Sequence, residues 1–408
     1  MVSGLLLVGL AVAVFVGFNI GGSSTSVAFG PAVGSKTLSK FGAAALMTVF
    51  AFLGGWTVGR NVLATLGGRI VPSDAFTLGV SIAVLFFIGF ALFLSNYVGV
   101  PASTSMTTVG ALVGLGLAEG NLNWAEMGRI VSWWLVSPLI AFWVSGVVGR
   151  YAYPYLVRWF EIDQSEGSLL VLDRSGAIPR PALGPNTTTR EFVGTAAVIV
   201  ISCYMAFSAG ASNVPNAVAP LVGNGALSLE QGLLLGAVAL GLGAFTIARR
   251  TLDTVGNDLT EMPILAALVV AVVSATVVTV LSQLGVPASF VIIATMSIVG
   301  LGWGRATRAI EPDEDDGPVS VDALTADAPD TPTVGAAGER DRPDAGAARG
   351  RDPATPTEPI QANGEGVSDP SDLFEPGRTA RVIVTQNLVP TVATVAAYLL
   401  FRFVPPFA

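Results

Sequence analysis

Gly210-Ala-Ser-Asn-Val-Pro-Asn-Ala-Val-Ala-Pro-Leu-Val-Gly223 is the stretch that decides the fold, because the chain contains a second version of it. The earlier version, Gly21-Gly-Ser-Ser-Thr-Ser-Val-Ala-Phe-Gly-Pro-Ala-Val-Gly34, aligns with it at an offset of 189 residues. A second pair follows at an offset of 186, where Val100-Pro-Ala-Ser103 matches Val286-Pro-Ala-Ser289. The chain therefore consists of two homologous halves, and this duplication constrains how every shorter motif is interpreted.

Long apolar runs surround both copies of the repeat. The chain has 408 residues, of which 52% are hydrophobic and 12% charged, with a mean hydropathy of +0.66. This composition excludes a single soluble globule and predicts a multi-pass protein of the cell membrane. The clearest runs near the ~20 residues that span a bilayer are Val2–Phe18, Phe41–Val58, Phe76–Leu94, Ile130–Val148, Phe192–Phe207, Leu233–Ala248, Ile264–Leu281 and Val382–Phe401.

Four shorter apolar segments are interrupted by Gly, Pro and Ser. They are Val27–Val33, Ala102–Leu117, Ala217–Val222 and Ala288–Leu301. Interrupted segments at membrane depth occur where backbone lines a protein cavity, and matched pairs of them in two halves are typical of secondary transporters. We therefore expect an all-α polytopic membrane protein with two inverted repeats, broken helices or re-entrant hairpins, and about 10–12 membrane segments.

Composition divides the chain into five regions. We expect a first membrane repeat at 1–149, a polar connector at 150–191, a second repeat at 192–309, an acidic disordered insert at 310–378 and a C-terminal transmembrane helix at 379–408. The insert carries 17 acidic and 5 basic residues, a net charge of −12 against −8 for the whole chain. Its low apolar content predicts disorder. Acidic residues with few lysines also suggest a halophilic, salt-adapted source.

The polar residues of the interrupted segments are the candidate substrate ligands. Hydroxyls and amides that precede apolar runs resemble helix N-caps, and helix N-termini bind oxyanions without a cationic side chain. Small polar residues also pack at membrane helix contacts, which is the simpler explanation for any one of them. The candidates are Ser23, Ser24, Thr25, Ser103, Thr104, Ser105, Ser212, Asn213, Asn216 and Ser289.

Several function classes are disfavoured by what the sequence lacks. It contains no His and one Cys, which removes His-based acid–base chemistry and His-rich metal sites. We therefore expect no enzyme activity, no cofactor and no nucleic-acid partner. The expected partners are an inorganic anion and the lipid bilayer, and a homodimer is compatible with this interpretation.

Both motifs resemble the duplicated signatures of the inorganic phosphate transporter (PiT) family. The stretch that ends at Gly223 is similar to the family's GANDVANAxGPxVG, and Val100-Pro-Ala-Ser-Thr-Ser-Met106 is similar to its second element, GxPxSTTH, with Met106 in place of the His. The resemblance implies an inverted-repeat carrier for phosphate that is coupled to Na⁺ or H⁺. Some members are assigned sulfate, so a sulfate-permease branch is a second implication.

The chain departs from the family pattern at its acidic positions. The Asn-Asp pair of the signature falls at Ser23–Ser24 and at Ser212–Asn213, so both carboxylates are replaced. The candidate sodium ligands are then the neutral side chains of Ser24, Asn213 and Asn216, which cannot take up a coupling proton. Phosphate keeps a P–OH that needs an acceptor, whereas sulfate needs only donors. Phosphate transport is the leading hypothesis, with sulfate transport and a passive anion channel as alternatives.

Overall fold

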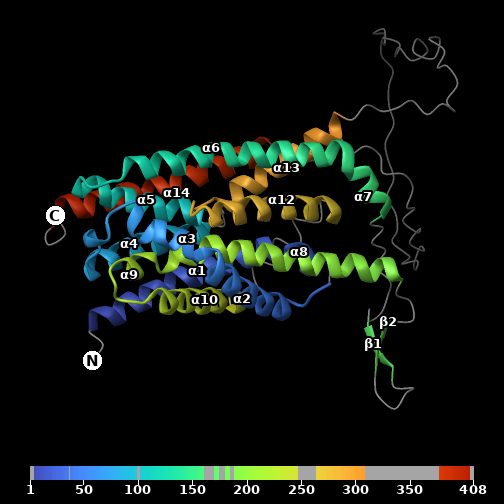
Figure 1. Ribbon diagram of the computed structural model, residues 1–408, viewed down its shortest axis with the longest axis horizontal. Helices are drawn as coiled ribbons and strands as arrows, with labels where there is room; N and C mark the ends of the chain where they lie inside the picture. Colours follow the sequence, from blue (N-terminus) through green and yellow to red (C-terminus); the bar gives the residue numbers. More distant parts are fainter. Residues whose placement is uncertain are drawn as a thin grey trace, which may run out of the picture. The chain divides into compact units, whose positions relative to one another are not determined.

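The computed structural model describes residues 4–35, 37–98, 102–159, 170–173, 180–183, 188–246, 263–307 and 376–404. The chain divides into two units, residues 1–307 with 369–408 and residues 308–368, and every described residue belongs to the first. Its long helices lie side by side with roughly parallel axes (Figure 1). The helices are α1 Gly4–Gly34, α2 Lys40–Thr57, α3 Gly59–Ala64, α4 Leu78–Val98, α5 Thr104–Glu119, α6 Trp124–Val147, α7 Tyr153–Trp159, α8 Thr189–Asn213, α9 Ala219–Gly223, α10 Leu229–Thr246, α12 Ile264–Gln283, α13 Phe290–Ala306 and α14 Pro376–Phe403.

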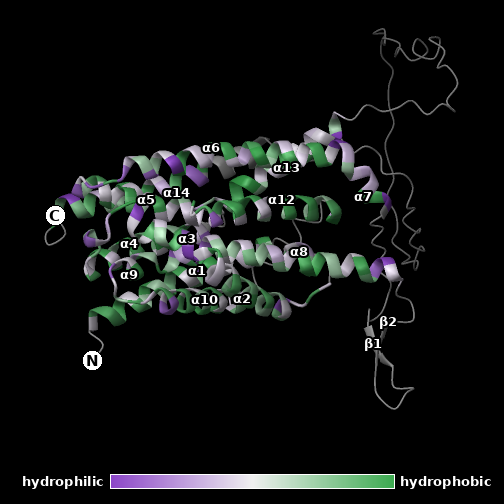
Figure 2. Ribbon diagram, in the orientation of Figure 1, coloured by the Kyte–Doolittle hydropathy of each residue, from purple (hydrophilic) through white to green (hydrophobic). Residues whose placement is uncertain are grey.

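The hydropathy of these helices fits a bilayer. Seven of the described helical stretches are long and apolar enough to cross a membrane. Hydrophobic residues cover most of their length, while hydrophilic residues gather mainly toward the helix ends (Figure 2). The predicted total of membrane segments also counts shorter helices such as α5 and α13, which have 16 and 17 residues. The prediction of an all-helical, multi-pass membrane protein is confirmed for the membrane region.

The sequence repeat is visible in the helix boundaries. At the offset of 189 residues, α2 maps onto α10 from its first residue to its last, and α1 begins the first half as α8 begins the second. At the offset of 186, α4 and α5 map onto α12 and α13 within one or two residues. The helix α14 takes the place in the second half that α6 has in the first, since α14 packs on α5 as α6 packs on α13. The acidic insert therefore interrupts the second repeat just before its last helix.

Glycines allow helices of one half to pack closely against helices of the other half. A Cβ atom on Gly21 of α1 would overlap the carbonyl oxygen of Leu240 in α10. The repeat-equivalent Gly210 of α8 meets the carbonyl oxygen of Ala51 in α2 in the same way. Only a residue without a side chain allows helix backbones to approach so closely. The helices α1, α2, α8 and α10 therefore form one interleaved centre rather than two separate halves.

The two copies of the decisive stretch have different conformations. In the second copy α8 ends at Asn213, a 3-10 turn (η4) covers Pro215–Ala217, and α9 begins at Ala219. In the first copy α1 continues without a break to Gly34, so the prediction of a broken segment there is wrong. One difference that favours the break is that Pro215 of the second copy corresponds to Ser26 of the first. Proline lacks the backbone N–H and clashes with the preceding turn, whereas Ser26 allows the helix to continue.

The connector and the insert are only partly described. The connector contains a π-helical turn (η3, Val148–Ala152), α7 and a two-stranded antiparallel hairpin, which the all-helical prediction omitted. In this hairpin β1 (Leu170–Asp173) pairs with β2 (Arg180–Leu183), with Leu170 opposite Leu183. The predicted insert at 310–378 lies outside the described residues except for its last three, which belong to α14.

Candidate functional site

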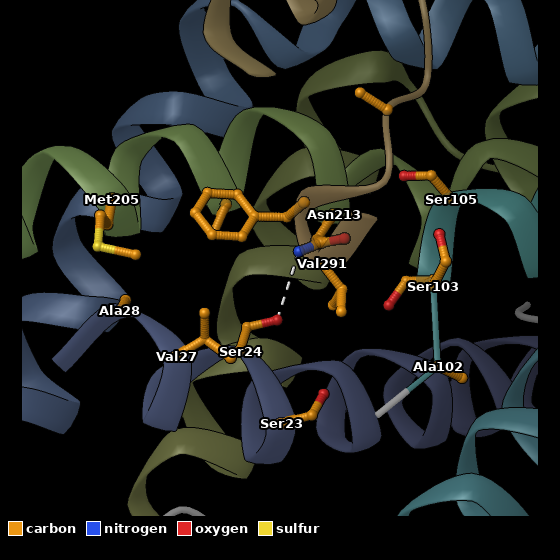
Figure 3. Close-up of a pocket in the computed structure, with 14 residues that line it drawn as sticks. Ser23, Ser24, Val27, Ala28, Ala102, Ser103, Ser105, Met205, Asn213 and Val291 are labelled. Atoms are coloured by element: carbon orange, nitrogen blue, oxygen red, sulfur yellow. Dashed lines mark hydrogen bonds between the residues drawn. The ribbon is translucent and has the colours of Figure 1, made fainter. Parts of the chain in front are cut away.

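A pocket lies where α1, α5, α8 and α13 meet, and Figure 3 shows its lining. Its empty volume is about 560 Å³, which includes the open mouth. Both halves of the repeat contribute to it. The lining residues are Ser23, Ser24, Val27, Ala28, Ala102, Ser103, Thr104, Ser105, Met205, Ala209, Asn213, Ala288, Phe290 and Val291.

Two half-helices begin at this pocket. The Ser103 hydroxyl caps α5 by accepting a hydrogen bond from the Met106 N–H at 3.3 Å. Its repeat-equivalent Ser289 caps α13 by accepting from the Ile292 N–H at 3.4 Å. The predicted N-caps are thus confirmed at both VPAS segments. Each helix start presents further backbone N–H groups that have no partner within the helix, together with the positive end of the helix dipole.

The centre of the pocket is marked by a pair of repeat-equivalent residues. The side-chain amide of Asn213 donates to the Ser24 hydroxyl at 3.3 Å, and the two positions are 189 residues apart (Figure 3). Because this separation is the repeat offset itself, equivalent positions of the two halves meet at this hydrogen bond. Ser24 is only partly buried, so its hydroxyl is available to a ligand in the pocket.

One side of the pocket contains a polar cluster, defined here as Ser105, Ser212 and Asn216. The Ser105 and Ser212 hydroxyls lie 3.1 Å apart, and the Asn216 amide donates to Ser105 at 3.2 Å. Ser212 also donates to the carbonyl oxygen of Ala288 at 3.1 Å. The Oδ1 atom of Asn216 is buried and has no hydrogen-bond partner among the described residues. A buried acceptor without a partner is costly, which is an indication that a ligand satisfies it.

The opposite side of the pocket lacks such a cluster. The residues equivalent to Ser105, Ser212 and Asn216 are Val291, Ser23 and Val27. The Ser23 hydroxyl is directed to its own helix, where it donates to the Ile20 carbonyl oxygen at 3.1 Å. The backbone frame is therefore repeated, but the polar groups are concentrated on one side.

The ten candidate ligands predicted from the sequence fall into three groups by their position relative to the pocket. Six of them line the pocket: Ser23, Ser24, Ser103, Thr104, Ser105 and Asn213. Ser212, Asn216 and Ser289 lie directly behind this lining and hold it by the hydrogen bonds given above. Thr25 is fully buried and donates to the Gly21 carbonyl oxygen at 2.7 Å, so its hydroxyl serves helix α1.

Sequence reasoning missed several apolar residues of the lining. Met205, Ala209 and Asn213 are spaced four apart on α8 and form one helix face. That spacing could have identified the first two once Asn213 was a candidate. Asn96 was also missed: its side-chain amide donates to the Asn19 carbonyl oxygen at 3.2 Å, which ties the end of α4 to the turn of α1 that carries Ser23.

The pocket is electrically neutral in its side chains. No acidic or basic residue is among those that line it. Within the described parts of the chain, no group of three or more His, Cys, Asp or Glu residues could hold a metal ion. Any charge preference of the site must therefore come from helix ends, hydroxyls and amides.

Comparisons with known proteins agree with this arrangement. The profile of the phosphate transporter family matches residues 20–317. The sulfate permease CysP of Bacillus subtilis (strain 168) is 30% identical over 300 residues, which cover 73% of this chain and 77% of that protein. A putative phosphate permease of Helicobacter pylori (strain ATCC 700392 / 26695) is 28% identical over 369 residues, covering 74% of this chain and 69% of the relative.

A solved structure supports the fold. The protein described as the sodium-dependent phosphate transporter matches 98% of this chain and 100% of its own length, with a TM-score of 0.63 and 19% identity. At that identity the likeness concerns the fold. The family profile covers most of the membrane region, including both copies of the repeat and both VPAS segments. The chain belongs to the phosphate transporter family.

Proposed function

We propose that this protein is a secondary transporter that carries inorganic phosphate across the cell membrane. The observation that carries the proposal is the start of two N-capped half-helices, α5 and α13, at one pocket. Helix N-termini attract anions through free N–H groups and the helix dipole. The hydroxyls of Ser24 and Ser103 and the amide of Asn213 add neutral donors from the lining.

Sodium is the coupling ion that best suits the polar cluster. The Asn216 Oδ1 atom, the Ser105 and Ser212 hydroxyls and the Ala288 carbonyl supply neutral oxygens, which are suitable ligands for a hard cation. Ser24 and Asn213, at the centre of the pocket, are further candidate ligands. None of these groups can take up a proton at working pH. We therefore infer Na⁺ coupling in preference to H⁺ coupling.

Sulfate is the second candidate substrate. It is favoured by the absence of a carboxylate from the pocket lining, because sulfate has no proton to donate. The 30% identity to the relative named sulfate permease CysP supports this alternative. Phosphate stays the first choice because the matching family profile is that of phosphate transporters, and because hydroxyl oxygens of the lining such as that of Ser24 can accept from a P–OH group.

The geometry also favours one kind of transport movement. We infer that the two halves are inverted, which their opposite courses support: α1 begins at the left of Figure 1 and α8 begins at the right. The first and second halves of the sequence cannot move apart at this interleaved centre, because close contacts at glycines join α1 to α10 and α2 to α8. Glycine contacts also join α5 to α14 and α13 to α6. Alternating access then requires these two pairs to move against the centre.

Uptake into proteoliposomes tests the proposal. Purified protein should take up labelled phosphate with saturation, and an inward Na⁺ gradient should drive accumulation above the external concentration. Absence of saturable uptake of both phosphate and sulfate would contradict a carrier function. Uptake that never exceeds equilibration would instead identify a passive anion channel. Competition between the two anions decides which one is preferred.

A further inference from the structure

A second group of residues with anion chemistry lies at the end of the α6–α13 pair. Arg305, in the last turn of α13, places its guanidinium over the ring of Tyr153, with 4.6 Å between Cζ and the ring centroid. Arg150, in the π-helical turn η3, donates from Nη1 to the Thr307 carbonyl oxygen at 2.9 Å. The two arginines are therefore held on the same end of one helix pair.

Neither arginine has an acidic partner among the residues that the structure describes. No carboxylate among the described residues forms an ion pair with Arg150 or Arg305, and Nη1 of Arg305 is shielded from solvent without a hydrogen-bond partner. Two other arginines of the molecule are compensated: Arg60 pairs with Glu230 at 3.6 Å and Arg129 pairs with Glu126. A shielded guanidinium without an acceptor is costly, and its planar array of donors matches phosphate oxygens.

The surroundings place this pair of arginines at the depth of lipid headgroups. Tyr151 in η3 and Tyr155 in α7 are exposed by 63% and 72%. Trp143 on α6 lies seven residues before Arg150, and Trp303 on α13 lies two residues before Arg305, with their rings 5.6 Å apart. Exposed tyrosine and tryptophan side chains collect at membrane–water interfaces, and basic pockets between transmembrane helices bind anionic headgroups.

We propose that Arg150 and Arg305 bind the phosphodiester headgroup of an anionic membrane lipid. Arg305 offers the guanidinium donors other than the shielded Nη1, and Arg150 offers the donors not used on Thr307. The exposed side chain of Arg158 on α7 adds charge nearby. The acyl chains would lie along the exposed apolar side chains of Trp143 and Val147 on α6, which a free phosphate ion could not use. This site is separate from the transport pocket.

The test is a lipid titration of the full-length protein in a neutral detergent, with the midpoint of thermal unfolding as the readout. Short-chain phosphatidylglycerol should raise the midpoint, and phosphatidylcholine of equal chain length should not. At about 1 kcal/mol for each arginine near an anionic headgroup, Arg150→Gln or Arg305→Gln should each raise the half-effective concentration about 5-fold, and the double variant about 25-fold. Arg305→Lys, which keeps the charge but loses the planar fork, should give an intermediate value.

The control is Arg69→Gln. Arg69 is exposed and lies in the other π-helical turn, η1 (Thr65–Arg69), so this variant makes the same charge change without touching the proposed site. Its lipid response should equal that of the wild type. If the double variant unfolds in detergent, the single variant Arg150→Gln and Arg305→Lys still test the proposal.

Three outcomes would overturn the lipid site. The first is an unchanged phosphatidylglycerol response in the arginine variants. The second is stabilisation by inorganic phosphate alone that disappears in those variants, which would identify a site for the free ion. The third is a response that appears only after deletion of residues 310–368, which would mean that the acidic insert occupies the arginines in the intact chain.

Discussion

The two sides of the transport pocket have the same backbone plan but different polarity. On one side Ser105, Ser212 and Asn216 form a hydrogen-bonded cluster, and on the other side Val291 and Val27 replace two of its three members. The N-caps Ser103 and Ser289, by contrast, are alike in both halves. The difference suggests that the two parts of the pocket have separate roles: the paired helix starts attract the anion, and the polar side binds the coupling ion.

The largest effect is expected from making the polar side resemble its counterpart. Asn216→Val removes hydrogen bonds to Ser105 and to the Ser212 carbonyl, and it removes the buried oxygen. At roughly 1–3 kcal/mol for a buried polar group that loses its partners, Na⁺-driven uptake should fall by about 5- to 150-fold. The reverse change, Val27→Asn, is the matched control and should leave uptake within about 3-fold of wild type. Equal losses of uptake in both variants would contradict separate roles for the two sides of the pocket.

A smaller effect is expected at the hub of the cluster. Ser105→Ala deletes the hydroxyl that contacts both Ser212 and Asn216, so the Na⁺ concentration for half-maximal uptake should rise about 5-fold. Val291→Ala changes the equivalent position, where no polar group is lost, and should shift that concentration by less than about 2-fold. A larger effect of Val291→Ala than of Ser105→Ala would indicate that the ion binds on the side of Val291, which would contradict the proposed sodium site.

The two N-caps should respond alike. Ser103→Ala and Ser289→Ala each remove one capping hydrogen bond, at a cost of about 1 kcal/mol in stability. Both variants should lower the midpoint of thermal unfolding by similar amounts and weaken phosphate affinity to a similar degree. Isothermal titration with phosphate measures the affinity. A loss confined to one of the two would show that only one helix start faces the anion.

The smallest effect is expected where the repeat-equivalent residues Ser24 and Asn213 meet. The hydrogen bond between Asn213 and Ser24 is long, at 3.3 Å, so a double-mutant cycle with alanine at both positions should give a coupling energy of about 0.5 kcal/mol. The cycle can be measured on phosphate affinity. A coupling energy of zero would mean that the two side chains act independently on the anion.

Most of the fold could be predicted from the sequence because the repeat and the apolar runs are strong signals. Helix α2 and its equivalent α10 begin and end at matching positions, and Ser103 and Ser289 cap their helices as their place before an apolar run predicts. The break in the first copy was predicted wrongly because its sequence likeness to the second copy drew attention away from the differences between them, among them Ser26 in place of Pro215.

The polarity of the pocket was harder to predict. The positions of Ser105, Ser212 and Asn216 were known as candidates, but their mutual contacts depend on how α5 packs against the end of α8. The close contacts between Gly21 and Leu240 and between Gly210 and Ala51 likewise join residues far apart in the chain. Tertiary packing of this kind leaves only a weak trace in local sequence, chiefly as small residues on a helix face.

The most direct test is an experimental structure with arsenate, a heavier analogue of phosphate whose anomalous scattering locates it independently of the protein density. The anion should lie between the starts of α5 and α13, within hydrogen-bonding distance of Ser24 or Asn213 and of a backbone N–H in the first turn of α5. Anomalous density at another place, with none in this pocket, would contradict the central claim that paired helix starts hold the transported anion.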